Sequence, residues 1–179
     1  MMNDVQQRRD ERGWNQARLD EGFSLIELLI VMSIILILST LAIPQMRKLI
    51  KNANETSAQQ SVKTISDAER QYSVDYPTRG YTCTLSELGG DPKSGAPNAQ
   101  GAQLIDPTLA AGQKSGYTFA ITNCTKITVA NQDKYTSFEV TAVPQSVGHT
   151  GDSGYCDDDN NQVRKDRTGG TNCTEALGQ

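Results

Sequence analysis

One apolar run dominates the pattern of hydrophobic and polar positions along the chain. From Phe23 to Ile43, sixteen of twenty-one residues are apolar, and Glu27 is the only charged residue. A helix of this length spans roughly 30 Å, which is the thickness of the hydrocarbon core of a bilayer. Because the rest of the chain is too polar to wrap such a helix, we expect residues 23–43 to lie in a membrane.

An amphipathic helix is expected to continue from the apolar run, over residues 44–76. Apolar side chains recur there at steps of three to five residues, which is typical of a helix with one buried face. They are Met46, Leu49, Ile50, Ala53, Ala58, Val62, Ile65, Ala68 and Tyr72. Tyr76-Pro77 should end the helix, since a residue before proline disfavours the helical region. The pattern predicts one helix of about fifty residues, half in lipid and half covered by a domain.

A connecting region rich in turn-forming residues is predicted at residues 77–115. Within it, Thr84-Leu85-Ser86-Glu87 has the spacing of a capping box, and Gly89-Gly90 can end a helical turn. We therefore expect one short helical turn here, tied to the body of the domain by Cys83.

Short strands are predicted after residue 115, because apolar and polar residues alternate. The apolar members are Tyr117, Phe119 and Ile121, then Ile127 and Val129, then Phe138, Val140 and Ala142. Residues 131–134 should form the turn before the third set, and a last hairpin is expected through Tyr155-Cys156 and Val163. The expected fold is α+β, a long N-terminal helix packed on a small antiparallel β-sheet.

Composition limits the soluble part to one modest domain, since only 36% of the 179 residues are hydrophobic and many lie in the apolar run. All four cysteines, Cys83, Cys124, Cys156 and Cys173, follow that run. An even number suggests two disulfides in an oxidising compartment, although four cysteines allow three pairings. Lys and Arg are balanced on the two sides of the run, so the cysteines place the C-terminal part outside the cytoplasm.

Charge and candidate chemistry favour neither nucleic-acid binding nor an enzyme. A net charge of −4 leaves no electrostatic footprint for nucleic acid, and His149 stands alone in a glycine-rich stretch without a nucleophile motif. No metal site or cofactor is expected. Residues 157–161 could offer oxygen ligands to calcium, but Gln162 and Thr168 stand where an EF-hand loop needs glycine and glutamate. A turn is the favoured interpretation of these residues.

The segment Gly22-Phe23-Ser24-Leu25-Ile26-Glu27-Leu28-Leu29 resembles the processing site of type IV pilins and of the pseudopilins of type II secretion. The resemblance implies that a prepilin peptidase cuts between Gly22 and Phe23, that residues 1–22 are a leader, and that Phe23 becomes N-methylated. It also implies that Glu27, the fifth mature residue, helps filament assembly, and that Pro44 bends the helix. The leader departs from the family pattern in being long and in carrying Asp20 and Glu21 beside the cut.

The resemblance adds a role for Glu27 and a disulfide pairing. The Glu27 carboxylate would meet the freed amine of Phe23 in a neighbouring subunit, so that neither charge lies unpaired in an apolar filament core. The alternative is a carboxylate that only reaches the lipid headgroups. The spacing of Cys156 and Cys173 resembles the C-terminal disulfide-bounded loop of type IV pilins, which leaves Cys83 to pair with Cys124.

The expected protein is a structural subunit of a type IV pilus, a homo-oligomeric helical filament for adhesion or motility. Before assembly it would cross the inner membrane once. Two alternatives stay open, a pseudopilin of a type II secretion system and a single-span binding domain that never polymerises. The predicted organisation is a leader at 1–22, a membrane or filament-core helix at 23–43, its amphipathic continuation at 44–76, and a soluble part at 77–179.

Overall fold

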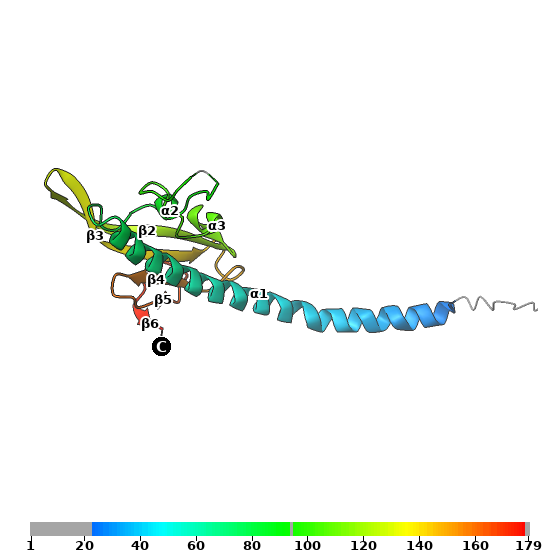
Figure 1. Cartoon of the computed structure of the whole chain (residues 1–179). Coiled ribbons are helices and arrows are strands. Elements are labelled where there is room, and N and C mark those ends of the chain that lie inside the picture. The colour runs from blue at the N-terminus through cyan, green and yellow to red at the C-terminus, as the bar shows by residue number, and fades with distance from the viewer. Residues whose placement is uncertain (1–22, 94, 178–179) are drawn as a thin grey trace, which may run out of the picture. The chain divides into compact units, whose positions relative to one another are not determined.

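The computed structural model describes residues 23–93 and 95–177, and the chain divides after Leu41 into two compact units. One long helix, α1 (Leu25–Asp75), begins in the first unit and ends in the second (Figure 1). The helix is 51 residues long, so the single N-terminal helix predicted from the apolar pattern is confirmed.

The second unit is built on a six-stranded antiparallel sheet whose spatial order follows the chain. Its strands are β1 (Gln113–Lys114), β2 (Tyr117–Val129), β3 (Gln132–Pro144), β4 (Gly154–Asp158), β5 (Arg164–Asp166) and β6 (Glu175–Ala176). The expected α+β fold, a long helix on an antiparallel sheet, is confirmed (Figure 1). The expected last hairpin is formed by β4 and β5.

The two strands expected before the turn are a single strand, so that part of the prediction was wrong. β2 runs unbroken past Ile121 to Val129 with a bulge between Thr122 and Thr125, where Asn123 has a φ of 51°. A bulge inserts extra residues without ending the pairing, which is why polar residues interrupt the alternation but not the strand.

The turn between β2 and β3 is also shorter than the predicted turn at residues 131–134. Only Ala130 and Asn131 connect the strands, and both have positive φ, 51° and 64°. A two-residue hairpin needs such dihedrals because they match the twist of the flanking strands. Gln132 and Asp133, which were expected in the turn, pair with Val129 and Thr128 instead.

The connecting region holds two helical turns, α2 (Leu85–Leu88) and α3 (Pro107–Ala110). The turn at α2 was predicted, but its capping box was not formed, because the Thr84 side chain makes no capping hydrogen bond. Glu87 instead accepts a hydrogen bond from the Thr82 hydroxyl at 2.6 Å. The sequence analysis missed α3, where the Asp106 carboxylate accepts from the backbone N–H of Leu109 at 3.0 Å, as an N-cap does.

The core lies between one face of α1 and the sheet (Figure 1). The helix contributes Ala58, Val62, Ile65, Ala68 and Tyr72, and the strands contribute Tyr117, Phe119, Ile121, Phe138, Val140, Ala142 and Tyr155. Burial of each large side chain stabilises the fold by about 1.5–3 kcal/mol. The first part of the predicted stripe is not covered, since Met46, Leu49 and Ile50 are exposed. Core packing therefore begins at Ala58 rather than at the end of the apolar run.

Candidate functional site

The helix begins directly after the predicted processing point. Phe23 is 82% exposed, and the Ser24 carbonyl accepts the first helical hydrogen bond, from the backbone N–H of Leu28 at 3.1 Å. Gly22 lies outside the described residues. Phe23 and Ser24 precede α1 without regular secondary structure, and the predicted cut would leave only these two residues before the helix.

Glu27 lies in the first turn of α1 and is exposed. A carboxylate at this position is next to the unpaired N–H groups that begin every helix, and their partial positive charge stabilises it by about 0.3–1 kcal/mol. The sequence analysis did not consider this contribution. It is far smaller than the cost of placing an unpaired carboxylate in an apolar medium.

The hydroxyl groups within the apolar run are already satisfied inside the helix. Ser33 donates to the carbonyl of Leu29 and Ser39 to that of Ile35, both at 2.7 Å, and Thr40 donates to the carbonyl of Ile37 at 2.7 Å. Each hydroxyl bonds one turn back along the helix, a pattern open to serine and threonine. These three residues therefore need no polar partner from lipid or from another chain.

The apolar side chains of this segment have no cover within the chain. The large ones between Leu25 and Leu38 expose between 46% and 78% of their area. The most apolar window of α1 has a mean hydropathy of 2.7 and none of it is buried, so by length and composition this helix can cross a membrane. The N-terminal part of α1 has the properties of a membrane anchor.

Pro44 lies inside α1, and the bend proposed for it stays a prediction. Proline lacks the N–H that would bond to the carbonyl four residues earlier. The assignment of residues 23–43 and 44–76 to two functional halves of the helix likewise remains a prediction.

Two disulfides staple the second unit, Cys83–Cys124 and Cys156–Cys173, which is the pairing that the family resemblance implied. The first ties the segment after α1 to the bulge of β2. The second ties buried strand β4 to the C-terminal segment. The two disulfides therefore hold the connecting region after α1 and the C-terminal segment, which contain only short helices and strands.

Residues 157–161 are used as the end of a strand and a turn. Asp157 is buried, and its carboxylate accepts from the backbone N–H of Asp158 at 3.0 Å. Asp158 forms an ion pair with Arg164 at 2.8 Å, and Asn161 has a φ of 59°. Across residues 23–93 and 95–177, no group of three or more His, Cys, Asp or Glu side chains is placed to hold a metal ion.

A buried carboxyl on the inner face of α1 was missed by the sequence analysis. Glu69 is fully buried, and one of its oxygens accepts from the backbone N–H of Thr82 at 2.8 Å while the other has no hydrogen-bond partner. Burial raises the pKa of Glu69 to about 8, opposed by the Thr82 hydrogen bond and reinforced by the nearby charge of Glu87. The available signal was spacing, because position 69 falls between the buried residues Ile65 and Tyr72 on the same helical face.

Comparison with known proteins identifies the N-terminal segment. Residues 18–43 match the family model of the prokaryotic N-terminal methylation motif. Neither the curated proteins nor the solved structures yield a match. The matched segment includes Phe23, Glu27 and the exposed apolar side chains described above, and a motif of this kind belongs to a structural protein that a prepilin peptidase processes. The motif and the uncovered apolar helix together indicate a precursor of the type IV pilin or pseudopilin class.

Proposed function

We propose that this chain is a structural subunit of a type IV pilus. It is anchored in the inner membrane with its second unit outside the cytoplasm, cleaved between Gly22 and Phe23, and methylated on the new N-terminus. The subunits then polymerise through α1 into a cell-surface filament for adhesion or motility. The chain catalyses no reaction in this role, and it needs no cofactor.

The observation that carries the proposal is a single carboxylate, Glu27, in the otherwise apolar N-terminal segment of α1, which the chain itself leaves uncovered. Lipid can cover the apolar residues of this helix while the subunit is in the membrane. Once the subunit leaves the membrane, only other copies of the helix offer an apolar surface of matching length. A filament core of packed helices supplies that cover.

Glu27 needs a positive partner in such a core, and cleavage creates one. The cut frees an amine at Phe23, which precedes the first turn of the helix that carries Glu27. In a low-dielectric environment, opposite charges from two neighbouring subunits attract strongly, whereas either charge alone is strongly unfavourable. The pair would set the register of one subunit against the next.

The C-terminal half of the chain supports a pilus over a secretion pseudopilus. Cys156–Cys173 encloses a polar C-terminal segment, which resembles the disulfide-bounded loop of pilins. The acidic residues 157–161 fit a strand end and turn, with Asp158 committed to Arg164. A pseudopilin of type II secretion is the second candidate, since the N-terminal motif is common to both classes.

The decisive experiment is the recovery of surface fibres by shearing, followed by mass spectrometry of their subunits. The proposal expects fibres whose subunits begin at N-methyl-Phe23. Subunits that remain in the membrane fraction under conditions in which the cells bear no fibres would favour the secretion or non-polymerising alternatives. An intact leader in assembled fibres would contradict the processing step.

The charge pair is tested by Glu27→Gln, which keeps size and polarity but removes the charge. The variant should accumulate in the membrane and be cleaved, yet yield fibres at less than about one tenth of the wild-type level, since the loss of a charge partner in a low-dielectric core costs at least 1.4 kcal/mol per contact. Asp159→Asn is the matched control, because Asp159 is an exposed carboxylate in the β4–β5 turn. Wild-type fibre yield from Glu27→Gln would mean that Glu27 only reaches the headgroups.

A further inference from the structure

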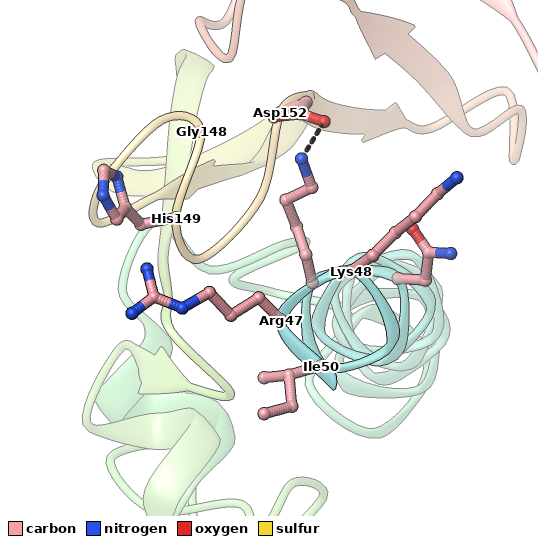
Figure 2. Close-up of a pocket in the computed structure, with 8 residues that line it drawn as sticks. Arg47, Lys48, Ile50, Gly148, His149 and Asp152 are labelled. Carbon is pink, nitrogen blue, oxygen red and sulfur yellow. Dashed lines mark ion pairs between the residues drawn. The ribbon is translucent and has the colours of Figure 1, made fainter. Parts of the chain in front are cut away.

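A loop of the second unit lies against α1 just beyond the apolar run. The loop is residues 145–153, between β3 and β4, and its exposed side chains include Val147 and His149. On the helix, Arg47 and Lys48 are exposed at the same end of the unit. We call these four residues the cationic corner. Arg47, Lys48 and His149 line a cavity of about 730 Å³ between the helix and the loop. Figure 2 shows the Arg47 side chain extending from the helix toward the side on which the loop carries His149, whereas Lys48 extends toward the other side of Lys51.

The loop is held on the helix by polar contacts that span almost a hundred residues of sequence. Lys51 forms an ion pair with Asp152 at 2.6 Å, drawn as the dashed line in Figure 2. The Asn54 side-chain amide donates to the carbonyl of Thr150 at 3.0 Å, and Glu55 accepts from the backbone N–H of Asp152 at 2.7 Å. These contacts hold residues 150–152 of the loop against α1.

The charge at the corner is only partly balanced. Asp152 forms an ion pair with Lys51, but Arg47 and Lys48 form no ion pair with any residue that the structure describes. Val147, two residues before His149 in the same loop, is 56% exposed. A surface that carries both unpaired cations and an exposed aliphatic side chain favours an anionic lipid surface, where the charges pair with phosphate and the aliphatic side chain enters the interface.

The position of the corner along the chain selects this partner. Arg47 and Lys48 follow Ile43, the last residue of the apolar run, by four and five positions. At 1.5 Å per residue this is about 6–8 Å along the helix, the depth at which lipid headgroups flank the hydrocarbon core. The loop contacts α1 at Lys51, Asn54 and Glu55, within the next few turns.

We propose that the cationic corner docks on the phosphate headgroups of anionic phospholipids and holds the second unit against the membrane surface before assembly. Arg47 and Lys48 pair with the phosphates, and Val147 inserts into the interface. The inference rests on the membrane anchoring in the proposed function but is independent of polymerisation. Docking of this kind would fix the orientation from which a subunit enters a filament.

Tryptophan fluorescence tests the docking in the full-length chain. Trp14 is the only tryptophan, so Trp14→Phe provides a background without signal. Val147→Trp then reports on the corner, and Val129→Trp on the β2–β3 hairpin is the matched control, since both valines are 56% exposed. In vesicles of brominated phosphatidylcholine with phosphatidylglycerol, we expect quenching and a blue shift for Val147→Trp and neither for Val129→Trp.

Charge variants separate docking by headgroups from contact by chance. Arg47→Gln with Lys48→Gln in the Val147→Trp chain should lower the docking equilibrium by about fivefold for each cation removed. Lys93→Gln with Lys134→Gln removes the same charge elsewhere and should leave the quenching unchanged. Vesicles of brominated phosphatidylcholine alone should abolish most of the quenching, and added salt should weaken it.

Three outcomes would overturn the proposal. Equal quenching at residues 147 and 129 would mean that the corner has no preference for the membrane. A blue shift that rises with protein concentration in the absence of phosphatidylglycerol would assign the corner to a second copy of the chain. A chain that floats with vesicles but shows no quenching at residue 147 refutes the docking alone, whereas a chain that does not float refutes the membrane anchoring as well.

Discussion

Glu69 is the residue whose environment differs most from what its chemistry favours. It lies fully buried between α1 and the segment after it, with a hydrogen bond from Thr82 to only one of its two oxygens. With a pKa of about 8 in the folded chain, the carboxyl is mainly protonated at neutral pH. The helix thus carries a neutral polar group at a position where an apolar one would pack.

Stability should therefore fall as the pH rises from about 4.5 to about 8. The folded pKa is raised, so between these values the folded chain holds a proton that the unfolded chain has released, and each further rise favours unfolding. Glu69→Gln removes the titrating group, and its stability relative to the wild type should increase across this window by at most about 5 kcal/mol. Chemical denaturation of the full chain in detergent at several pH values measures the difference.

Asp67→Asn is the control for this prediction, because Asp67 is exposed on the same helix and pairs with Arg70. Its stability relative to the wild type should change little between pH 4.5 and 8. If Glu69→Gln and the wild type show parallel pH profiles over the window, the carboxyl is ionised in the folded chain and the interpretation of its burial is wrong.

At the scale of elements, the disulfides replace contacts that the short strands cannot make. β6 is two residues long and exposed, and β5 is three residues long. Closing loops with sequence separations of 17 and 41 residues restricts the unfolded chain by about 3 and about 4 kcal/mol respectively. The staples therefore stabilise the ends of the second unit as much as a few buried side chains do.

Removal of each disulfide should have a distinct local effect. Cys156→Ser with Cys173→Ser should lower the unfolding free energy by about 3 kcal/mol and increase amide exchange in residues 164–177, which depend on that staple. Cys83→Ser with Cys124→Ser should cost about 4 kcal/mol and increase exchange near the bulge of β2. Exchange that rises uniformly across the sheet in both variants would contradict the local roles.

The periodicity of apolar residues predicted most of the helices and strands. It was least reliable where pairing with a distant strand determines how far an element extends. The alternation through Phe119 and Ile121 indicated a strand, but residues 122–126 contain no large apolar side chain, and only pairing with β3 shows that the strand continues. The helical stripe was correct from Ala58 to Tyr72. Over Met46 and Ile50 the same periodicity continues, but these side chains are exposed. Periodicity alone could not show that the sheet does not cover this part of the helix.

The residues of the candidate site also fall into those that a local sequence pattern identifies and those that only distant contacts identify. Phe23 and Glu27 could be identified from the sequence because a local motif defines them. Glu69 and the loop at Asp152 could not, since their environments depend on residues tens of positions away. The roles of Phe23 and Glu27 in processing and assembly thus stay predictions from a local motif, whereas the cationic corner required the structure.

At the scale of the whole molecule, processing and folding should be separable. The second unit has its own core and disulfides, all beyond residue 57, and none of these includes a residue of the apolar run. Gly22→Leu should therefore block cleavage and leave an oxidised, folded subunit in the membrane with its leader attached.

Mass spectrometry and non-reducing peptide mapping of the membrane fraction measure both properties. The expected result is a precursor that retains Met1 or Met2 and carries the peptides Cys83–Cys124 and Cys156–Cys173, without fibres on the cell. A reduced or degraded precursor would show that the leader influences folding of the second unit.

The internal bonds of Ser33, Ser39 and Thr40 have a consequence for how easily the helix changes surroundings. Their hydroxyls are satisfied equally well in lipid and among other helices, and hydrocarbon tails are about as apolar as leucine side chains. In the proposed filament, transfer of this segment from bilayer to fibre should therefore have a free energy close to zero along most of its length. With so small a free-energy difference, a subunit would be withdrawn from such a filament as readily as it is added, and the proposed pair of Phe23 and Glu27 would decide the direction.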